Sequence, residues 1–184
     1  MECWILEAGL RLIKKVNTAG KWWKWKYRYR KERKYDLMNQ VNTRGTYLCA
    51  QACLPHLLKS ENPHVLTLSP PLNVEARWFE NHVAYSIAKF GMSLCTLGMA
   101  SEFKGKVAFN SLWPKTIIAT AAIEFAVGNA QMMQLGRKAS IMADAAAAIL
   151  QKDAKTVSGH FYIDEDVLRA AAVSLAATVR SRLG

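Results

Sequence analysis

The feature that most constrains the fold is a helical stretch lying between two short apolar runs. Residues 64–68 and 107–113 are apolar runs of strand length, and residues 83–103 between them have the pattern of a helix. A second helical pattern covers residues 36–59, and a last short strand is expected near residues 160–163. This order of helices and strands predicts an α/β fold.

Within the 83–103 helix, Tyr85 and Lys89 are four residues apart and therefore lie one turn apart on the same face. A free tyrosine titrates near pH 10, so a phenol that exchanges protons near neutral pH needs its pKa lowered by roughly 3 units. A neighbouring ammonium favours the phenolate and supplies part of that lowering. The spacing alone is weak evidence, because Tyr27 and Lys31 share it within a solvated run of charges.

Two further polar side chains make the pair more specific. Asn42 lies in the 36–59 helix, and Ser69 directly follows the 64–68 strand. The order Asn42, Ser69, Tyr85, Lys89 resembles the catalytic tetrad of the short-chain dehydrogenase/reductase family. The resemblance spans residues 35–168, and it rests on segments such as VNTRGTYL at 41–48, AYSIAKFGMS at 84–93 and LWPKT at 112–116.

The resemblance implies a role for each member of this tetrad. Tyr85 would be the acid/base that exchanges a proton with a hydroxyl or carbonyl substrate, and Lys89 would lower the pKa of Tyr85. Ser69 would hold the substrate oxygen. Asn42 would keep a water molecule that relays protons from Lys89. The substrate implied is a small molecule, steroid-like or lipid-like by analogy with the family.

The cofactor implied by the resemblance is NAD or NADP, which supplies the hydride chemistry. The residues expected to bind it are Tyr85, Lys89, Pro114 and Thr120. Small side chains along the 83–103 helix also favour close packing against the sheet or a neighbouring subunit. A homo-oligomer would then form through helices 36–59 and 83–103.

The glycine pattern bears on the cofactor. A dinucleotide site needs a Gly-rich turn whose backbone N–H groups meet the pyrophosphate. No two of the ten glycines are spaced by two residues, so the sequence contains no Gly-x-Gly-x-x-Gly. By resemblance, the fold is therefore a partial Rossmann-type parallel sheet flanked by helices, the C-terminal half of such a domain. One edge of the 64–68 strand would be unpaired, and the chain would be a truncated product of doubtful activity.

Residues 1–34 form a basic arm outside the resemblance. Residues 1–35 contain 11 Lys and Arg against 3 Glu, and residues 21–34 interleave aromatic rings with these cations. Such a segment is typical of a nucleic-acid surface, an interfacial membrane segment or a presequence, or of a solvated arm that packs poorly on the body. The alternative to an oxidoreductase is a non-catalytic truncated variant whose arm binds membrane or nucleic acid.

The remaining features carry less information. Residues 169–184 are expected to form a helical tail with one apolar face. No run of 18 apolar residues predicts a membrane span, and no metal site is indicated by the spacing of the histidines and cysteines. The resemblance implies a peroxisomal or mitochondrial location, although the final Gly184 spoils a peroxisomal tripeptide.

Overall fold

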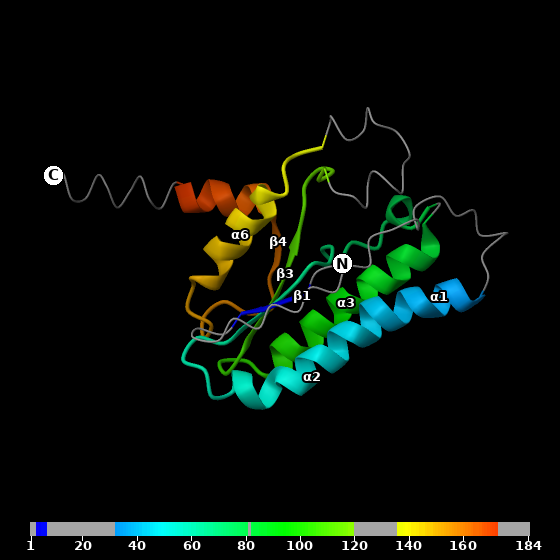
Figure 1. The fold of residues 1–184 in the computed structure, drawn as a ribbon. Helices are drawn as coiled ribbons and strands as arrows, with labels where there is room; N and C mark the ends of the chain where they lie inside the picture. The colour runs from blue at the N-terminus through cyan, green and yellow to red at the C-terminus, as the bar shows by residue number, and fades with distance from the viewer. Residues whose placement is uncertain (1–2, 7–31, 81, 120–135, 173–184) are drawn as a thin grey trace.

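A computed structural model of the chain describes residues 3–6, 32–80, 82–119 and 136–172, which form one sheet with helices on both faces (Figure 1). The four strands are β1 (Cys3–Leu6), β2 (His64–Thr67), β3 (Ala108–Trp113) and β4 (Phe161–Ile163), in the order β1-β2-β3-β4. β2 pairs with β3 and β3 pairs with β4, both in parallel. β1 pairs antiparallel with β2.

The helices lie in two layers. On one face of the sheet, a single helical stretch runs beside α3 (Figure 1). It comprises α1 (Glu32–Asn39), the π-helical η2 (Gln40–Arg44) and α2 (Gly45–Leu57), and α3 spans Val83–Glu102. On the other face lie α6 (Ser140–Leu150) and a helix over residues 164–172. The loop between β2 and α3 contains the short helix η3 (Ala76–Trp78).

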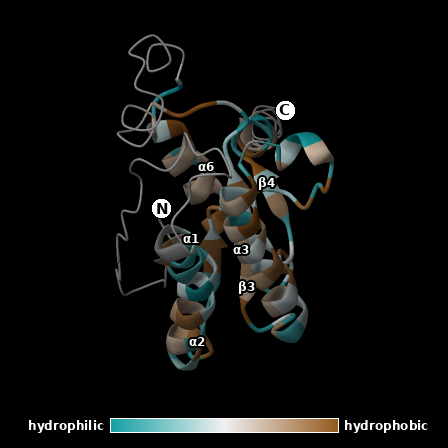
Figure 2. Cartoon of the chain, turned by 90° about the vertical axis from the view of Figure 1, so that its right-hand side faces the viewer, coloured by the Kyte–Doolittle hydropathy of each residue, from teal (hydrophilic) through white to brown (hydrophobic). Residues whose placement is uncertain are grey.

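Adjacent residues of the central strands serve two separate hydrophobic cores, because successive strand side chains point to opposite faces. Val65 packs in a core with residues of α2 and α3, whereas Leu66 packs in a second core with α6 and the helix over residues 164–172. Figure 2 shows hydrophobic segments where α2, α3 and β3 meet. The first core contains Ala50, Leu57, Val65, Ala100, Val107 and Phe109, and the second contains Leu66, Leu112, Ala145, Ile149 and Val167.

α3 is the central helix of the fold. By length and composition alone its 20 residues are enough to cross a membrane. Its buried face, however, carries polar groups such as Lys89, Ser93 and Thr96, and the helix packs on β3. These contacts are those of a core helix in an α/β domain.

The predicted α/β fold with a parallel sheet flanked by helices is confirmed. The strands expected at residues 64–68, 107–113 and 160–163 are β2, β3 and β4, and they are neighbours in one parallel sheet. The helices expected at residues 36–59 and 83–103 are present with ends shifted by a few residues. Of the predicted tail, residues 169–172 are helical and residues 173–184 lie outside the described part of the chain.

One expectation was wrong: the edge of β2 is paired. Residues Cys3–Leu6 form β1, with Cys3 opposite Thr67 and Leu6 opposite His64. The arm therefore does not pack poorly throughout, because its first residues extend the sheet. Unsatisfied N–H and C=O groups along a strand edge are costly, and an antiparallel strand satisfies them as well as a parallel one. The aromatic and basic residues 21–31 lie outside the described residues.

We expect deletion of residues 2–6 to expose the edge of β2. The deletion should lower the free energy of unfolding by about 1–2 kcal/mol, because a few backbone hydrogen bonds of about 1 kcal/mol each are lost. Self-association at high concentration should also increase, because an open strand edge invites pairing. Urea unfolding and sedimentation velocity measure the two effects, with Ile5→Val as a control that keeps the backbone. Identical stability and mass for the deleted and control chains would contradict the pairing of β1.

Candidate functional site

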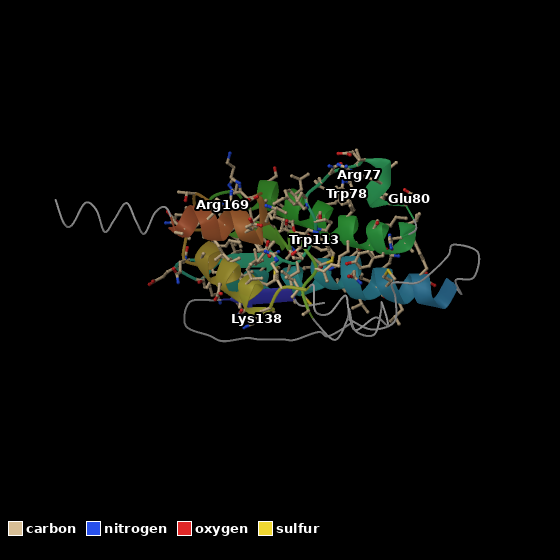
Figure 3. All side chains as sticks on the ribbon, turned by 90° about the horizontal axis from the view of Figure 1, so that it is seen from above. Arg77, Trp78, Glu80, Trp113, Lys138 and Arg169 are labelled. Carbon is tan, nitrogen blue, oxygen red and sulfur yellow. The ribbon has the colours of Figure 1, made fainter. Side chains whose placement is uncertain are left out.

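A cavity of about 390 Å³ lies at the carboxyl ends of the three parallel strands. This is where open α/β sheets bind their ligands. Tyr85 and Lys89 reach it from α3, and Trp113 and Pro114 reach it from the end of β3. Figure 3 shows Trp113 near the centre of the molecule. The described residues that line it are Pro70, Pro71, Asn73, Trp78, Tyr85, Ser86, Lys89, Phe90, Trp113, Pro114, Lys115, Ile163 and Asp166.

Lys89 is almost completely buried, with 7% of its surface exposed. Its Nζ donates a hydrogen bond of 2.9 Å to the backbone carbonyl of Leu68. The same Nζ lies 5.5 Å from the centre of the Trp113 ring, a distance typical of a cation–π contact. The ammonium is therefore held between the end of β2 and the end of β3.

Ser69 follows the carbonyl that Lys89 contacts, and its side chain is fully buried. Among the described residues its hydroxyl has no hydrogen-bond partner. The next residue, Pro70, lines the cavity, and its carbonyl accepts a 2.6 Å hydrogen bond from the hydroxyl of Ser93 on α3. A buried hydroxyl without a partner costs free energy, so Ser69 is suited to bind a polar atom of a ligand.

Asn42 lies within η2 and is also buried. Its side-chain amide donates a 2.8 Å hydrogen bond to the carbonyl of Met38, one turn earlier. Single π-helical turns inside α-helices occur frequently at functional sites. The next residue, Thr43, donates a 3.0 Å hydrogen bond from its hydroxyl to the carbonyl of Ala88 on α3.

Two hydrogen bonds therefore connect the segments that carry the predicted tetrad. The Thr43 hydroxyl joins the residue after Asn42 to the residue before Lys89. The Lys89 ammonium joins α3 to the residue before Ser69. Tyr85 lies one turn earlier on α3, at the wall of the same cavity. Tyr85 and Lys89 line the cavity, whereas Ser69 and Asn42 are not among the described residues that line it.

The electrostatics of Tyr85 differ from what the resemblance implied. Burial raises the pKa of Tyr85 to about 12, because an apolar environment disfavours the phenolate. The net shift of this pKa is therefore upward, opposite to the lowering that the resemblance implied, and the contribution of Lys89 stays a prediction. At neutral pH the phenol carries its proton.

Of the predicted cofactor residues, Pro114 lies at the cavity, and Thr120 lies outside the described residues. Sequence reasoning missed the aromatic wall formed by Trp78, Phe90 and Trp113. Trp113 directly precedes Pro114 at the end of a predicted strand, so its position was a usable signal. Trp78 gave no such signal, because it lies in the irregular loop before α3.

Sequence reasoning also missed a buried carboxylate that fixes one side of the cavity. Asp164 is fully buried and directly follows β4. It accepts hydrogen bonds from the backbone N–H of Lys115 and from the Arg137 guanidinium, at 3.0 and 2.6 Å. These bonds anchor Lys115 and Arg137 to the end of β4. Lys115 follows Pro114, and Arg137 lies in the segment that leads to α6. An ion pair in a buried position orders both segments, because breaking it would leave a buried charge.

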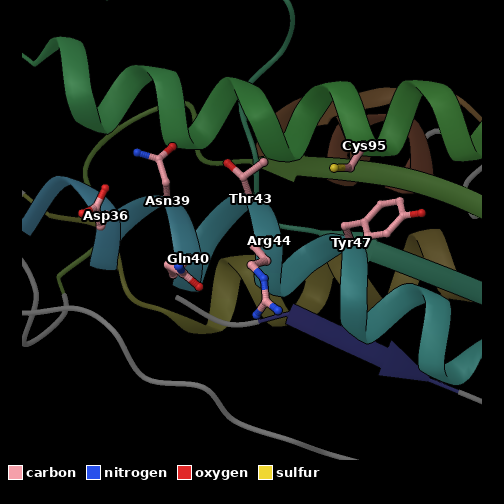
Figure 4. A pocket seen from close by; sticks show the side chains of 7 residues that line it. All are labelled: Asp36, Asn39, Gln40, Thr43, Arg44, Tyr47 and Cys95. Atoms are coloured by element: carbon pink, nitrogen blue, oxygen red, sulfur yellow. The ribbon is translucent and has the colours of Figure 1, made fainter. Parts of the chain in front are cut away.

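A second, open groove of about 460 Å³ is lined by residues of α1, η2, α2 and α3 (Figure 4). In Figure 4, the Thr43 side chain points from η2 toward α3. Exposed apolar side chains nearby include Tyr47 on α2 and Leu94 on α3. The predicted homo-oligomer through these helices stays a prediction. The groove is lined by Asp36, Asn39, Gln40, Thr43, Arg44, Tyr47 and Cys95.

Comparisons with known proteins agree with this geometry. A family model described as "Enoyl-(Acyl carrier protein) reductase" matches residues 12–165, so the match begins upstream of residue 35. "Hydroxysteroid dehydrogenase-like protein 2" of Danio rerio is 56% identical over 137 residues, which are 74% of this chain and 32% of that protein. The chain thus spans about a third of the length of the curated relatives it matches.

Solved structures share the fold. A putative dehydrogenase from Xanthomonas campestris has a TM-score of 0.78 and 47% identity, and the match covers 84% of this chain and 57% of that one. A putative short chain dehydrogenase from Shigella flexneri, complexed with NADP, has a TM-score of 0.69 at 17% identity. That match covers 82% of this chain and 61% of that one, and it shows the fold alone.

We expect Gly91→Ala to disrupt the junction between η2 and α3. A Cβ at Gly91 would collide with the Thr43 hydroxyl oxygen and would lie 2.7 Å from its methyl carbon. Thr43 must then move, its bond to Ala88 is lost, and the free energy of unfolding should fall by about 1–3 kcal/mol. Gly98→Ala on the same helix is the control, since a Cβ there meets nothing within 4 Å. It should be neutral or stabilise by up to about 1 kcal/mol. Equal effects of the two substitutions in thermal unfolding would refute the close contact.

We also expect the Tyr85 phenol to ionise only at high pH. Its pKa is raised to about 12 in the folded chain, above the value near 10 for an unfolded one. The ionisation of Tyr85 therefore leaves the free energy of unfolding unchanged below about pH 10. As the pH rises from about 10 through 12 the free energy of unfolding falls, because the unfolded chain releases the proton first. The difference in absorbance at 295 nm between wild type and Tyr85→Phe gives the midpoint. A midpoint below pH 9 in the ligand-free chain would show that Lys89 dominates after all.

Proposed function

The chain belongs to the short-chain dehydrogenase/reductase family, and from this premise we propose that it carries the proton-transfer residues of an NAD(P)-dependent oxidoreductase that interconverts a hydroxyl and a carbonyl. The observation that carries the proposal is the cavity at the strand ends, which Tyr85 and Lys89 line from one helix. The Ser69 hydroxyl is buried and finds no hydrogen-bond partner among the described residues, and the next residue, Pro70, lines that cavity, which supports the same assignment.

The residues around the cavity fit the nicotinamide side of the cofactor. Lys89 would bind the nicotinamide ribose, with Tyr85 beside it and Pro114 against the ring. Lys89 suits a ribose hydroxyl, because an ammonium is a hydrogen-bond donor that a hydroxyl oxygen accepts. When bound, the nicotinamide gives or takes the hydride. The neighbouring structure complexed with NADP supports this choice of cofactor class.

Tyr85 would exchange the proton at the substrate oxygen. Because its pKa is about 12 in the ligand-free chain, the phenol is protonated at neutral pH and is ready to donate. A protonated phenol suits the reduction of a carbonyl, whose oxygen needs a proton. Ser69 would hold that oxygen by a hydrogen bond, and Asn42 would support a water molecule that returns protons through Lys89.

The substrate would be largely apolar. Three aromatic side chains and four aliphatic or proline side chains line the cavity beside the two proton-transfer residues: Trp78, Phe90, Trp113, Pro70, Pro71, Pro114 and Ile163. Such walls favour burial of a hydrocarbon skeleton, while the few polar groups orient one oxygen. A steroid-like or lipid-like alcohol or ketone satisfies both conditions. The name of the relative from Danio rerio is consistent with this class.

We expect this chain by itself to bind NADH or NADPH weakly. The sequence holds no Gly-x-Gly turn for the pyrophosphate. Each missing helix-end or charge-assisted contact is worth roughly 1–3 kcal/mol, so three or four would weaken binding by several powers of ten. Fluorescence titration with both nucleotides at low and physiological salt measures the affinity. Binding by the basic residues alone would fade with salt.

The matched variant for this titration is Lys89→Ala. Saturable micromolar binding that survives salt and disappears in Lys89→Ala would contradict weak binding and would strengthen the enzymatic proposal. Weak binding that Lys89→Ala reduces further is the expected result. Weak binding that Lys89→Ala leaves unchanged would mean that the cavity does not contact the nucleotide, and the proposal would fail.

A further inference from the structure

Trp113 contacts Lys89, which we propose to act in proton transfer. Trp113 belongs to β3, whereas Leu68, whose carbonyl accepts the bond from Lys89, follows the neighbouring strand β2. Trp113 is the last residue of β3 and lines the cavity, and its ring centre is 5.5 Å from the Lys89 Nζ. We propose that Trp113 is a positioning residue, whose indole face fixes the buried ammonium of Lys89 at the cavity wall.

The burial of Lys89 makes this contact matter. With 7% of its surface exposed, the side chain has lost most of its water. The Leu68 carbonyl replaces part of that hydration with one hydrogen bond of 2.9 Å. A carbonyl directs one N–H of the ammonium. The negative face of an indole attracts the charge from a second direction, and this attraction is larger in a desolvated site than at a surface.

The two contacts come from adjacent parallel strands. Leu68 follows the end of β2, and Trp113 ends β3. The ammonium is thus located by the sheet from both strands, while its own backbone belongs to α3. A leucine at position 113 would keep an apolar wall but would offer no negative face. The ammonium would then lose its contact with the residue that ends β3.

The molecule contains a matched pair for comparison. Trp78 also lines the cavity, and its ring centre is 5.0 Å from the Arg77 guanidinium carbon. Trp78 is 52% exposed, so water competes for the cation in that pair. Figure 3 shows Arg77 and Trp78 side by side at the edge of the molecule, away from Trp113. Replacing Trp78 also removes an indole from the cavity wall, but it leaves the contact between Trp113 and Lys89 in place.

A double-mutant cycle tests the contact without any ligand. The cycle combines Trp113→Leu with Lys89→Met and measures unfolding in urea. We expect the two substitutions to be non-additive by about tenfold in the unfolding equilibrium constant, the size expected for a desolvated cation–π pair. The control cycle of Trp78→Leu with Lys89→Met should be additive within about twofold. Additivity in the Trp113 cycle, or equal coupling in both cycles, would overturn the proposal.

A second measurement covers the case in which Trp113→Leu does not fold. The emission of the Trp113 indole is obtained by subtracting the fluorescence spectrum of Trp113→Phe from that of the wild-type chain. The Trp113→Phe variant keeps an aromatic ring. This difference spectrum should change when Lys89 is replaced by Met, because the charge at the ring face is removed. The corresponding difference for Trp78→Phe should not change. Trp113 emission that does not respond to Lys89→Met would overturn the proposal.

The consequence for cofactor affinity rests on the proposed function and is tested separately, by titration with NADPH. If the wild-type chain binds NADPH, Trp113→Leu should raise Kd by about tenfold and Trp113→Phe by less than about threefold, since a benzene ring keeps part of the attraction. An unchanged Kd in Trp113→Leu would overturn the positioning role. If NADPH does not bind to wild type, the proposed function fails, and the two ligand-free measurements still decide whether Trp113 positions Lys89.

Discussion

The hydrogen bond from the Lys89 ammonium to the Leu68 carbonyl is the interaction on which the site depends. A buried ammonium is costly unless its lost hydration is replaced, so α3 must dock where Lys89 reaches a strand end. Tyr85 lies one turn away on α3, and Ser69 follows Leu68 in the chain. A single bond therefore sets where the phenol lies relative to the hydroxyl at the end of β2. The bond from Thr43 to Ala88 and the close contact at Gly91 fix η2 against the same turn of α3.

The helices, the parallel strands and the Tyr85–Lys89 pair were predictable because each depends on local pattern. Apolar periodicity marks strands and helices, and a spacing of four residues places two side chains on one helical face. The pairing of residues 3–6 with residues 64–67 was not predictable, because nothing local records which segments meet across 60 residues. The role of Asp164 was missed for the same reason, since Lys115 and Arg137, which donate to it, are 49 and 27 residues away in the sequence.

The direction of the Tyr85 pKa shows a different limit of sequence reasoning. The sequence identifies the neighbouring cation but not the degree of burial, and burial decides the result in the ligand-free chain. The protonated Tyr85 phenol, one turn from the Lys89 ammonium on α3, can donate a proton as an acid. The aromatic wall that includes Trp113 supplies both the apolar surroundings and a second contact for the cation. The nicotinamide and the pyrophosphate of a cofactor would contact separate parts of such a fold, and the cavity carries the residues that we propose for the nicotinamide.

The most direct measurement of the central claim is a crystal structure of the ligand-free chain at a resolution that places side-chain atoms. The account predicts that the Lys89 Nζ donates to the Leu68 carbonyl at about 3 Å, the usual hydrogen-bond distance. The Ser69 and Tyr85 hydroxyls should then lie well within about 10 Å of each other, which is a few times the hydrogen-bond distance. Two observations together would contradict the account. The Lys89 side chain would be turned to solvent, and the two hydroxyls would be more than about 10 Å apart, which is three hydrogen-bond lengths or more.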